Sequence, residues 1–178
     1  MMEKSDKFIE KAQKIRWFFT DVDGTLTDGR VYYSSEGEQL KTFSLRDGAG
    51  FFLLRQVGIK TGIITTECSP IVAQRAKKLH VDAYISGAEK KGDVMLQFIE
   101  NHQLNWEEIA YIGDEINDCK LIEECGLTFA VADAADIIKQ KADIVCKCVG
   151  GQHAFREAVG VLLNLREVDV DEIIKKSL

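Results

Sequence analysis

Short runs of apolar residues recur along the chain at the spacing of strands in a parallel sheet. They cover residues 15–19, 61–64, 83–85, 109–112, 127–131 and 142–146. Helical patterns lie between most of these runs, at residues 69–79, 91–102, 118–125 and 134–141, and a further helix is expected at about 48–57. Near-continuous apolar strands that alternate with helices are typical of a doubly wound parallel sheet with helices on both faces. The pattern therefore predicts an α/β fold.

One segment interrupts this alternation. Residues 31–34 and 39–43, joined through a segment that contains Gly37, predict a β-hairpin. A two-stranded hairpin is marginally stable alone and exposes its edges. We therefore expect its aromatic side chains to pack on another subunit, which predicts oligomerisation.

Composition indicates one soluble domain over residues 1–178, because no linker, repeat or low-complexity tract interrupts the chain. The net charge of −6 argues against a nucleic-acid partner. No apolar run approaches the roughly 20 residues of a membrane span, and residues 1–7 are too polar for a signal peptide. The five cysteines lack the pattern of a secreted scaffold and are expected to be reduced thiols, so we expect a cytoplasmic protein.

Two aspartates, Asp21 and Asp23, follow the first apolar run. In strand geometry they would point to the same side and repel each other. The chain must therefore turn here, and Gly24 gives it the freedom to do so. Acids crowded at the end of a buried strand are costly unless a cation neutralises them. The pattern suits one carboxylate as a nucleophile and one as an acid/base, with Mg²⁺ between them. An ordinary acidic turn is the alternative.

Further candidate residues follow the later strands. The hydroxyl of Thr65 could hydrogen-bond a phosphate oxygen. Lys91 opens a helix, where its ammonium could neutralise a phosphoryl group and hold the nucleophile ionised. Lys90 beside it is the competing choice. Each signal is weak alone, and their order along the chain makes the case for phosphoryl transfer.

An acidic cluster follows the run at 109–112. Asp114 is placed to join Asp21 on a hard cation that takes oxygen ligands. Asn117 and Asp118 could bind metal-coordinated water or orient the lysine. In an open parallel sheet, ligands bind beyond the carboxyl ends of the strands, which is where these acids lie.

Together these residues resemble the four motifs of the haloacid dehalogenase-like phosphotransferases. The motifs are Asp-x-Asp-Gly-Thr at 21–25, the strand-end Thr65, Gly-x-x-x-Lys at 87–91 and Gly-Asp-x-x-Asn-Asp at 113–118. Residues 27–50 and 150–157 narrow the resemblance to the 3-deoxy-D-manno-octulosonate 8-phosphate phosphatase family, over about residues 15–163. It implies a fold without a cap domain and a homotetramer whose hairpins meet in a central barrel. It also implies that a neighbour's C-terminal segment closes each active site.

The resemblance also implies a role for each motif residue. Asp21 would attack phosphorus to give an aspartyl-phosphate. Asp23 would protonate the leaving oxygen and then activate the hydrolytic water. Mg²⁺, Lys91 and Thr65 would spread the phosphoryl charge. The implied metal ligands are Asp21, Asp114 and the backbone carbonyl of Asp23.

The substrate would be the phosphate ester of a 2-keto sugar acid with eight or nine carbons. Glu67, Arg75 and Lys78 resemble a trio in the relative acting on 2-keto-3-deoxy-nononate 9-phosphate. The alternative for Arg75 and Lys78 is an exposed basic pair on a solvated helix. Arg75, Lys78 or a neighbour's Arg156 could anchor the substrate carboxylate.

Two residues depart from the family pattern, and two other functions stay open. Glu115 replaces a common aspartate and is expected to lie outside the direct ligands, and His153 could reshape the rim of the site. One alternative is a non-catalytic tetramerising module that partners a nucleotidylyl-sugar synthetase, although both Asp21 and Asp23 are present. The other is a receiver-type phosphorylation switch, which the hairpin and an acid/base Asp23 do not fit.

Overall fold

The computed structural model describes residues 6–177 and contains one parallel sheet of six strands. The strand order is β5-β4-β1-β6-β7-β8, and every neighbouring pair is parallel. The strands are β1 (Trp17–Thr20), β4 (Lys60–Ile64), β5 (Ala83–Ile85), β6 (Ile109–Gly113), β7 (Leu127–Ala130) and β8 (Ile144–Val145). The predicted α/β fold is confirmed, and residues 6–177 contain no cap domain.

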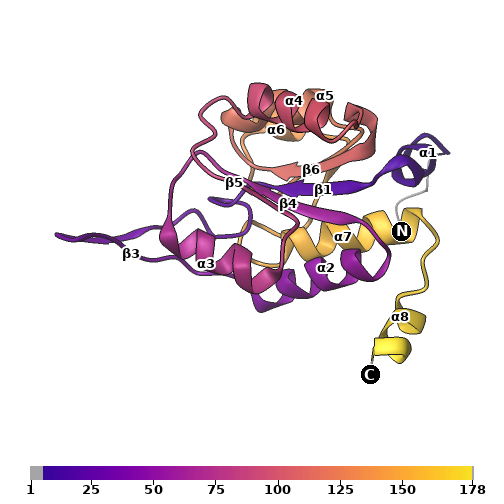
Figure 1. Ribbon diagram of the computed structural model, residues 1–178, viewed down its shortest axis with the longest axis horizontal. Helices are drawn as coiled ribbons and strands as arrows, with labels where there is room; N and C mark the ends of the chain where they lie inside the picture. Colours follow the sequence, from indigo (N-terminus) through magenta and orange to yellow (C-terminus); the bar gives the residue numbers. More distant parts are fainter. Residues whose placement is uncertain (1–5, 178) are drawn as a thin grey trace.

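Helices cover both faces of this sheet (Figure 1). One face carries α2 (Leu45–Gln56), α3 (Pro70–Leu79) and α7 (Ala154–Leu165), and the other carries α4 (Lys91–Asn101), α5 (Cys119–Glu124) and α6 (Asp136–Lys141). The remaining helices are α1 (Asp6–Lys14), α8 (Val170–Ser177) and the short 3-10 turns η1 (Trp106–Glu108) and η2 (Ile116–Asp118). Three of these helices, α1, α7 and α8, were not predicted from the sequence.

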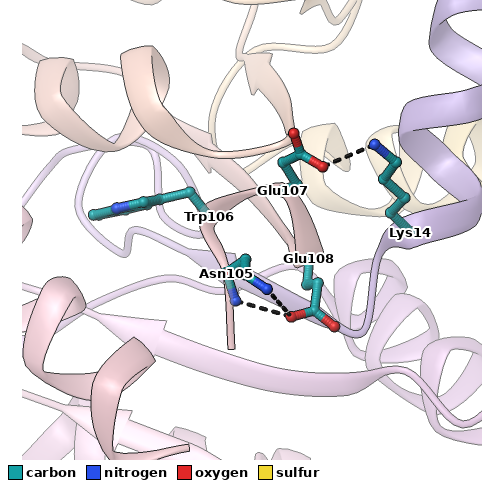
Figure 2. Close-up of a pocket in the computed structure, with 5 residues that line it drawn as sticks. All are labelled: Lys14, Asn105, Trp106, Glu107 and Glu108. Atoms are coloured by element: carbon teal, nitrogen blue, oxygen red, sulfur yellow. Dashed lines mark hydrogen bonds and ion pairs between the residues drawn. The ribbon is translucent and has the colours of Figure 1, made fainter. Parts of the chain in front are cut away.

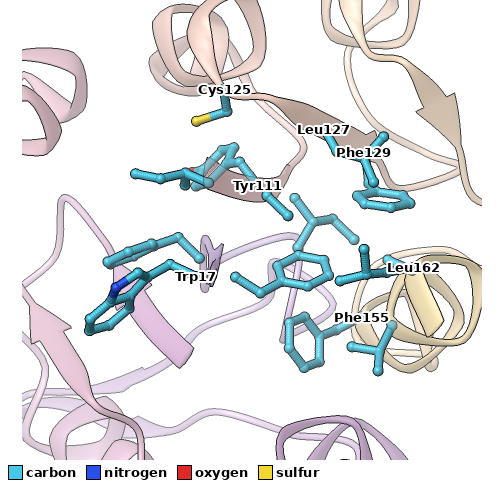
Figure 3. Close-up of a cluster of buried hydrophobic side chains, with 14 of the residues drawn as sticks. Trp17, Tyr111, Cys125, Leu127, Phe129, Phe155 and Leu162 are labelled. Carbon is cyan, nitrogen blue, oxygen red and sulfur yellow. The ribbon is translucent and has the colours of Figure 1, made fainter. Parts of the chain in front are cut away.

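Side chains that alternate along β1 contribute to the core on both faces of the sheet. Figure 3 shows a cluster of the buried apolar side chains of this core. Trp17 and Phe19 point to the α4 side, where each ring meets Phe98 edge-on at centroid distances of 4.9 and 5.0 Å. Phe18 points to the opposite side and contacts Phe155 of α7 at 5.2 Å. Because side chains alternate with a period of two, Asp21 has the parity of Trp17 and Phe19 and falls on the α4 side.

The ends of several strands differ from the predicted ends. The run at 15–19 becomes a strand only from Trp17 to Thr20, and the run at 142–146 only at Ile144–Val145. Ile15 is apolar because it is buried at the edge of the core, and Ala142 because it packs against that core. Apolar character therefore marked burial at Ile15 and Ile144 but not at Val145, which is 43% exposed, and it overestimated the length of these strands.

The predicted hairpin is confirmed and projects from the body of the protein (Figure 1). It consists of β2 (Tyr32–Ser34) and β3 (Gly37–Leu40). The connection is shorter than predicted, because Gly37 already pairs with Ser34 and has a φ of +105°. Exposed apolar groups line it: Tyr32 is 50%, Tyr33 72% and Leu40 62% exposed.

Two expectations concern the membrane and the N-terminus. Within residues 6–177, no helix combines the length and the apolar character needed to cross a membrane. The prediction about a signal peptide rested mainly on residues 1–5, which lie outside the described residues.

Candidate active site

The loop after β1 holds the first two aspartates. The Asp21 amide still donates to the Ile112 carbonyl at 3.1 Å, and the chain then turns back on itself. Three successive amides, of residues 25–27, donate to the Val22 carbonyl at 3.2, 2.9 and 3.0 Å. Gly24 has a φ of +87°, as expected of a residue that lets the chain leave strand geometry. Asp21 is only 3% exposed, so its carboxylate is largely withdrawn from water.

Gly24 also makes room for Asp114. A Cβ at position 24 would lie 2.0 Å from Asp114 Oδ2, so no side chain fits there without moving this carboxylate. The Thr25 hydroxyl donates to Asp114 Oδ1 at 3.0 Å and fixes its orientation. The loop after β1 therefore both leaves space for Asp114, which follows β6, and donates a hydrogen bond to it.

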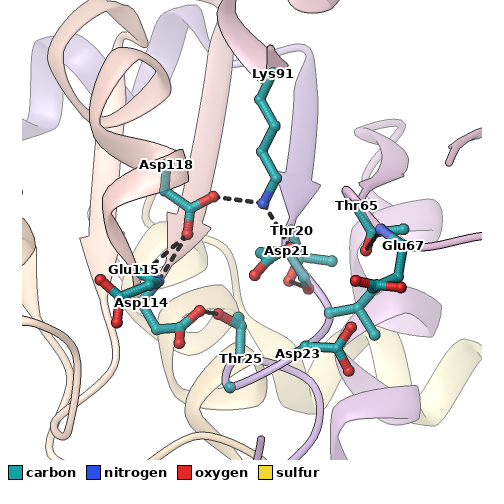
Figure 4. Close-up of polar contacts among 12 residues, drawn as sticks. Thr20, Asp21, Asp23, Thr25, Thr65, Glu67, Lys91, Asp114, Glu115 and Asp118 are labelled. Carbon is teal, nitrogen blue, oxygen red and sulfur yellow. Dashed lines mark hydrogen bonds and ion pairs between the residues drawn. The ribbon is translucent and has the colours of Figure 1, made fainter. Parts of the chain in front are cut away.

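Lys91 lies between the two strand-end loops (Figure 4). Its Nζ donates to Asp21 Oδ1 and to Asp118 Oδ1, both at 2.6 Å, and its side chain has no exposed surface. It can reach Asp21 because it opens α4, which covers the face toward which Asp21 points. Lys90, the competing choice, is exposed.

The charges in this cluster do not balance. Burial, followed by repulsion from Asp118, raises the pKa of Asp21 well above its usual value. Burial and the charge of Asp118 also raise the pKa of Asp114, to about 6. Burial lowers the pKa of Lys91, but the charges of Asp21 and Asp118 outweigh that effect and raise it. Three carboxylates against one ammonium leave a deficit of positive charge, which a cation would correct.

The hydrogen bonds of Asp118 decide which acids could hold that cation. Oxygens of Asp21, Asp114 and Asp118 all lie within 4.8 Å of one another. Asp118 is already saturated, because Oδ1 accepts from Lys91 and from the Tyr111 hydroxyl at 2.6 Å, and Oδ2 from two backbone amides. It therefore orients the lysine. Asp21 and Asp114 keep oxygens for a hard cation such as Mg²⁺, and Asn117 lines the cavity beside them.

A cavity of about 360 Å³ opens above these acids, between the hairpin and the carboxyl edge of the sheet. Its volume falls in the range of small-molecule sites. Its lining comes from both acid loops, the hairpin and the loop after β4: Asp21, Asp23, Gly24, Gly29, Val31, Tyr33, Glu38, Lys41, Thr65, Thr66, Glu67, Asp114, Glu115 and Asn117. Asp21 and Asp23 thus both line the space that a bound ligand would occupy.

The chain is similar to known proteins over most of its length. Residues 61–151 match the haloacid dehalogenase-like hydrolase family. The 3-deoxy-D-manno-octulosonate 8-phosphate phosphatase of Escherichia coli K12 is 35% identical over 170 residues, or 96% of this chain and 90% of the relative. The enzyme of that name from Haemophilus influenzae is 35% identical over 86% of each chain. The chain belongs to this phosphatase family.

Solved structures of relatives share the fold of the phosphatase. The cobalt-bound enzyme from Haemophilus influenzae aligns with a TM-score of 0.85 at 34% identity, over 88% of this chain and 92% of its own. The enzyme from Moraxella catarrhalis, in complex with a magnesium ion, a phosphate ion and 3-deoxy-D-manno-octulosonate, aligns with a TM-score of 0.91 at 32% identity. That alignment covers 97% of this chain and 99% of the relative.

The residues expected to recognise substrate divide into two groups in the phosphatase. Thr65 is 1% exposed, its hydroxyl accepts the Glu67 amide at 3.2 Å, and both residues line the cavity. Arg75 instead donates to the Ser44 carbonyl at 2.9 Å and lies over the Phe43 ring. Lys78 is exposed on α3. The structure brings Glu67 to the site but places neither Arg75 nor Lys78 in the cavity lining.

The segment at 150–157 packs on its own chain. The Gly151 amide donates to the Thr25 carbonyl at 3.0 Å, and a Cβ at Gly150 would lie 1.7 Å from the Gly24 carbonyl oxygen. The Arg156 amide donates to Asp47 at 2.9 Å. The two glycines thus pack against the loop that follows β1. Arg156 is not part of the cavity lining.

Glu115 and His153, the departures from the family pattern, occupy different places. Glu115 lies on the rim, and its carboxylate accepts the Ile116 amide at 2.8 Å. His153 Nδ1 lies 2.8 Å from the hydroxyl of Ser44, which caps α2, and His153 does not line the cavity. His153 thus joins α7 to α2 below the site.

Three residues that contact the central carboxylates were not predicted from the sequence. Thr25 was read only as part of a motif, and Tyr111 only as an apolar strand residue. Lys41, whose Nζ is paired with Asp23, lies within the predicted strand 39–43, where a single lysine has no distinguishing spacing. The periodic pattern of the sequence does not show which side chains from distant segments will contact each other.

A second pocket lies at the opposite edge of the sheet, at the amino ends of β1 and β6 (Figure 2). Its side chains are engaged with one another: Lys14 pairs with Glu107 at 2.8 Å, and the Asn105 amide donates to Glu108 at 2.8 Å. Ligands of open parallel sheets bind at the other edge, so we place the chemistry in the first cavity.

Proposed function

We propose that this protein is a Mg²⁺-dependent phosphatase that hydrolyses the phosphate monoester of a 3-deoxy-2-keto sugar acid. The observation that carries the proposal is the cluster of Asp21, Lys91 and Asp114 at the floor of a cavity that Asp23 also lines. The complex of the Moraxella catarrhalis relative with magnesium, phosphate and the eight-carbon sugar acid supports the metal and the substrate class.

Asp21 is the proposed nucleophile. Lys91 holds its Oδ1, so its other oxygen can attack phosphorus, forming an O–P bond as the bond to the sugar oxygen breaks. Asp21, Asp114 and the backbone carbonyl of Asp23 would hold the metal ion, which when bound neutralises charge on the phosphoryl oxygens. Lys91 adds a fixed positive charge beside the same group, and the Thr65 hydroxyl can donate to a phosphoryl oxygen.

Asp23 is the proposed acid and base. Protonated, it gives its proton to the departing sugar oxygen, and the resulting carboxylate then takes a proton from the water that attacks the aspartyl-phosphate. Water adds to phosphorus, the Asp21 carboxylate is released, and inorganic phosphate leaves. Asp23 lines the cavity beside Asp21, as both steps require.

The eight-carbon 3-deoxy-D-manno-octulosonate 8-phosphate is the first candidate substrate, because relatives named for it match at 35% identity. The nine-carbon 2-keto-3-deoxy-nononate 9-phosphate is the second, and it rests on Glu67, Arg75 and Lys78. Glu67 alone lines the cavity of the single chain, so Arg75 and Lys78 would act by moving or from a neighbouring subunit.

A kinetic comparison of the two sugar-acid phosphates tests the proposal. We expect Mg²⁺-dependent phosphate release with kcat/KM of at least about 10⁴ M⁻¹s⁻¹ for the preferred substrate. Arg75→Ala should spare both substrates if Arg75 only ties α3 to Ser44. A chain that releases no phosphate from either compound would instead fit the non-catalytic alternative.

We further propose that the functional unit is a homotetramer formed through the hairpin. Tyr32, Tyr33 and Leu40 expose apolar side chains on a projecting element, and Tyr32 pairs with Leu40 across its two strands. Exposed apolar groups that cluster in this way mark interaction sites in soluble proteins. Light scattering of the wild type and of Tyr33→Lys tests this. Dissociation of the variant is expected, and a fully active wild-type monomer would contradict the proposal.

A further inference from the structure

Lys41 is a buried lysine that the mechanism above does not use. It follows β3 at the base of the hairpin, and only 2% of its side chain is exposed. Its Nζ donates to Asp23 Oδ1 and contacts Glu38 Oε1 at 3.1 Å. A lysine is seldom withdrawn this far from water unless its charge is paired, and both of its partners line the active-site cavity.

The contact leaves the two oxygens of Asp23 in different states. Oδ1 is paired with Lys41, whereas Oδ2 is buried and has no hydrogen-bond partner among residues 6–177. A carboxylate held at one oxygen cannot rotate freely about its last bond. Oδ2 is thereby left as the oxygen with no protein group competing for its proton.

Lys41 is itself held by a chain of contacts that leaves the hairpin. Glu38 Oε2 accepts a hydrogen bond from the Ser69 hydroxyl. Ser69 caps α3, because its Oγ accepts the Val72 amide at 3.4 Å. The series from Ser69 through Glu38 and Lys41 to Asp23 thus links the start of α3, the hairpin and the proposed acid/base.

We propose that Lys41 is a positioning residue for the proton-transfer step, which holds the Asp23 carboxylate at Oδ1 and leaves Oδ2, which has no protein partner, for the proton that is transferred. The inference rests on the proposed role of Asp23. It also gives the hairpin a catalytic purpose, because the base of the hairpin carries the group that orients the acid/base. When a catalytic group is displaced, the rate of the chemical step in which it takes part falls, whereas the affinity for substrate is retained.

The choice of leaving group separates positioning from a structural role. A sugar alkoxide needs a proton to leave, whereas p-nitrophenolate leaves without one. The first chemical step is measured by rapid quench for the sugar-acid phosphate, and as the burst of p-nitrophenolate for p-nitrophenyl phosphate. We expect Lys41→Met to slow this step about 10- to 100-fold for the sugar ester and less than about 3-fold for the nitrophenyl ester. KM should change by less than about 3-fold.

Three further variants complete the test. Lys41→Arg keeps the charge and should recover part of the lost rate on the sugar ester. Glu38→Gln keeps an acceptor for Ser69 but weakens the interaction with Lys41. It should therefore slow the first step selectively on the sugar ester, by less than Lys41→Met does. This variant keeps the test possible if Lys41→Met folds poorly. Lys14→Met makes the same substitution in an exposed ion pair at the far pocket and should change neither rate.

Equal losses on both esters in Lys41→Met and Glu38→Gln would overturn the inference, because they would show a general defect of the site. A rise in KM with an unchanged rate would overturn it too, because Lys41 would then bind substrate. A wild-type protein that hydrolyses neither ester would refute the proposed function instead, so the two failures can be told apart.

Discussion

Replacing Lys91 by Met should destabilise the protein and abolish its activity together. The substitution keeps the length of the side chain but removes the ammonium that lies 2.6 Å from both Asp21 and Asp118. Removing one partner of a buried ion pair typically costs about 3–5 kcal/mol. At about 2–4 °C per kcal/mol for a domain of this size, Tm should fall by about 6–20 °C. Loss of the fixed charge beside the phosphoryl group should lower kcat at least about 100-fold.

The loss of stability should depend on pH in EDTA. Burial already raises the pKa of Asp21 in the folded protein, and Lys91 is the group that opposes this rise. Without Lys91 the pKa rises further, so the folded state binds more protons than the unfolded state at neutral pH. Stability then falls as pH increases above the unfolded value of about 4, so the gap between variant and wild type should be wider at neutral than at acidic pH.

Thermal unfolding and phosphate release measure both effects, and Lys90→Met is the matched control. Lys90 adjoins Lys91 but is exposed, so its replacement should change stability by no more than about 0.5 kcal/mol. If Lys91→Met matched this control in Tm and kept its activity, the buried cluster would not be the centre of the site.

Three further predictions follow from the site. Asp21→Asn and Asp23→Asn should each leave the fold intact but reduce phosphate release below about 1% of wild type, since acid–base catalysis alone is worth at least about 100-fold; circular dichroism is the control. EDTA should abolish turnover, Mg²⁺ should restore it and Ca²⁺ should inhibit, because Ca²⁺ takes more ligands at longer distances and would change the geometry of Asp21; full activity in EDTA would contradict the metal site. Gly24→Ala should weaken Mg²⁺ affinity, measured by calorimetry, because its Cβ would fall 2.0 Å from Asp114 Oδ2.

Local patterns were enough to predict the sheet and the loops that carry the acids. The run before Asp21 and the run before Asp114 form adjacent parallel strands, so their carboxyl ends meet as the α/β pattern implies. Motif order likewise pointed to Lys91, whose distance of 70 residues from Asp21 along the chain is bridged by α4 beginning beside β1. These features depend on the hydrophobic periodicity and on the order of the motifs along the chain, and both can be read directly from a sequence.

Contacts between separate side chains could not be predicted in this way. The pairing of Lys41 with Asp23 depends on how the base of the hairpin folds back over the acid loop. The direction of the Arg75 side chain depends on its hydrogen bond to the Ser44 carbonyl, and no sequence pattern indicates this bond. A helix position is compatible with several directions of a long side chain, and tertiary packing selects among them.

The most direct test of the central claim is to trap the phosphoryl group on Asp21. The enzyme is mixed with ³²P-labelled 3-deoxy-D-manno-octulosonate 8-phosphate and Mg²⁺, quenched in acid within one turnover, and digested with trypsin. Cleavage after Arg16 and Arg30 releases residues 17–30 as one peptide that contains Asp21. If Asp21 is the nucleophile, a hydroxylamine-labile label appears on this peptide in the wild type and none appears in Asp21→Asn. Steady release of phosphate with no label on residues 17–30 at any quench time would contradict this role.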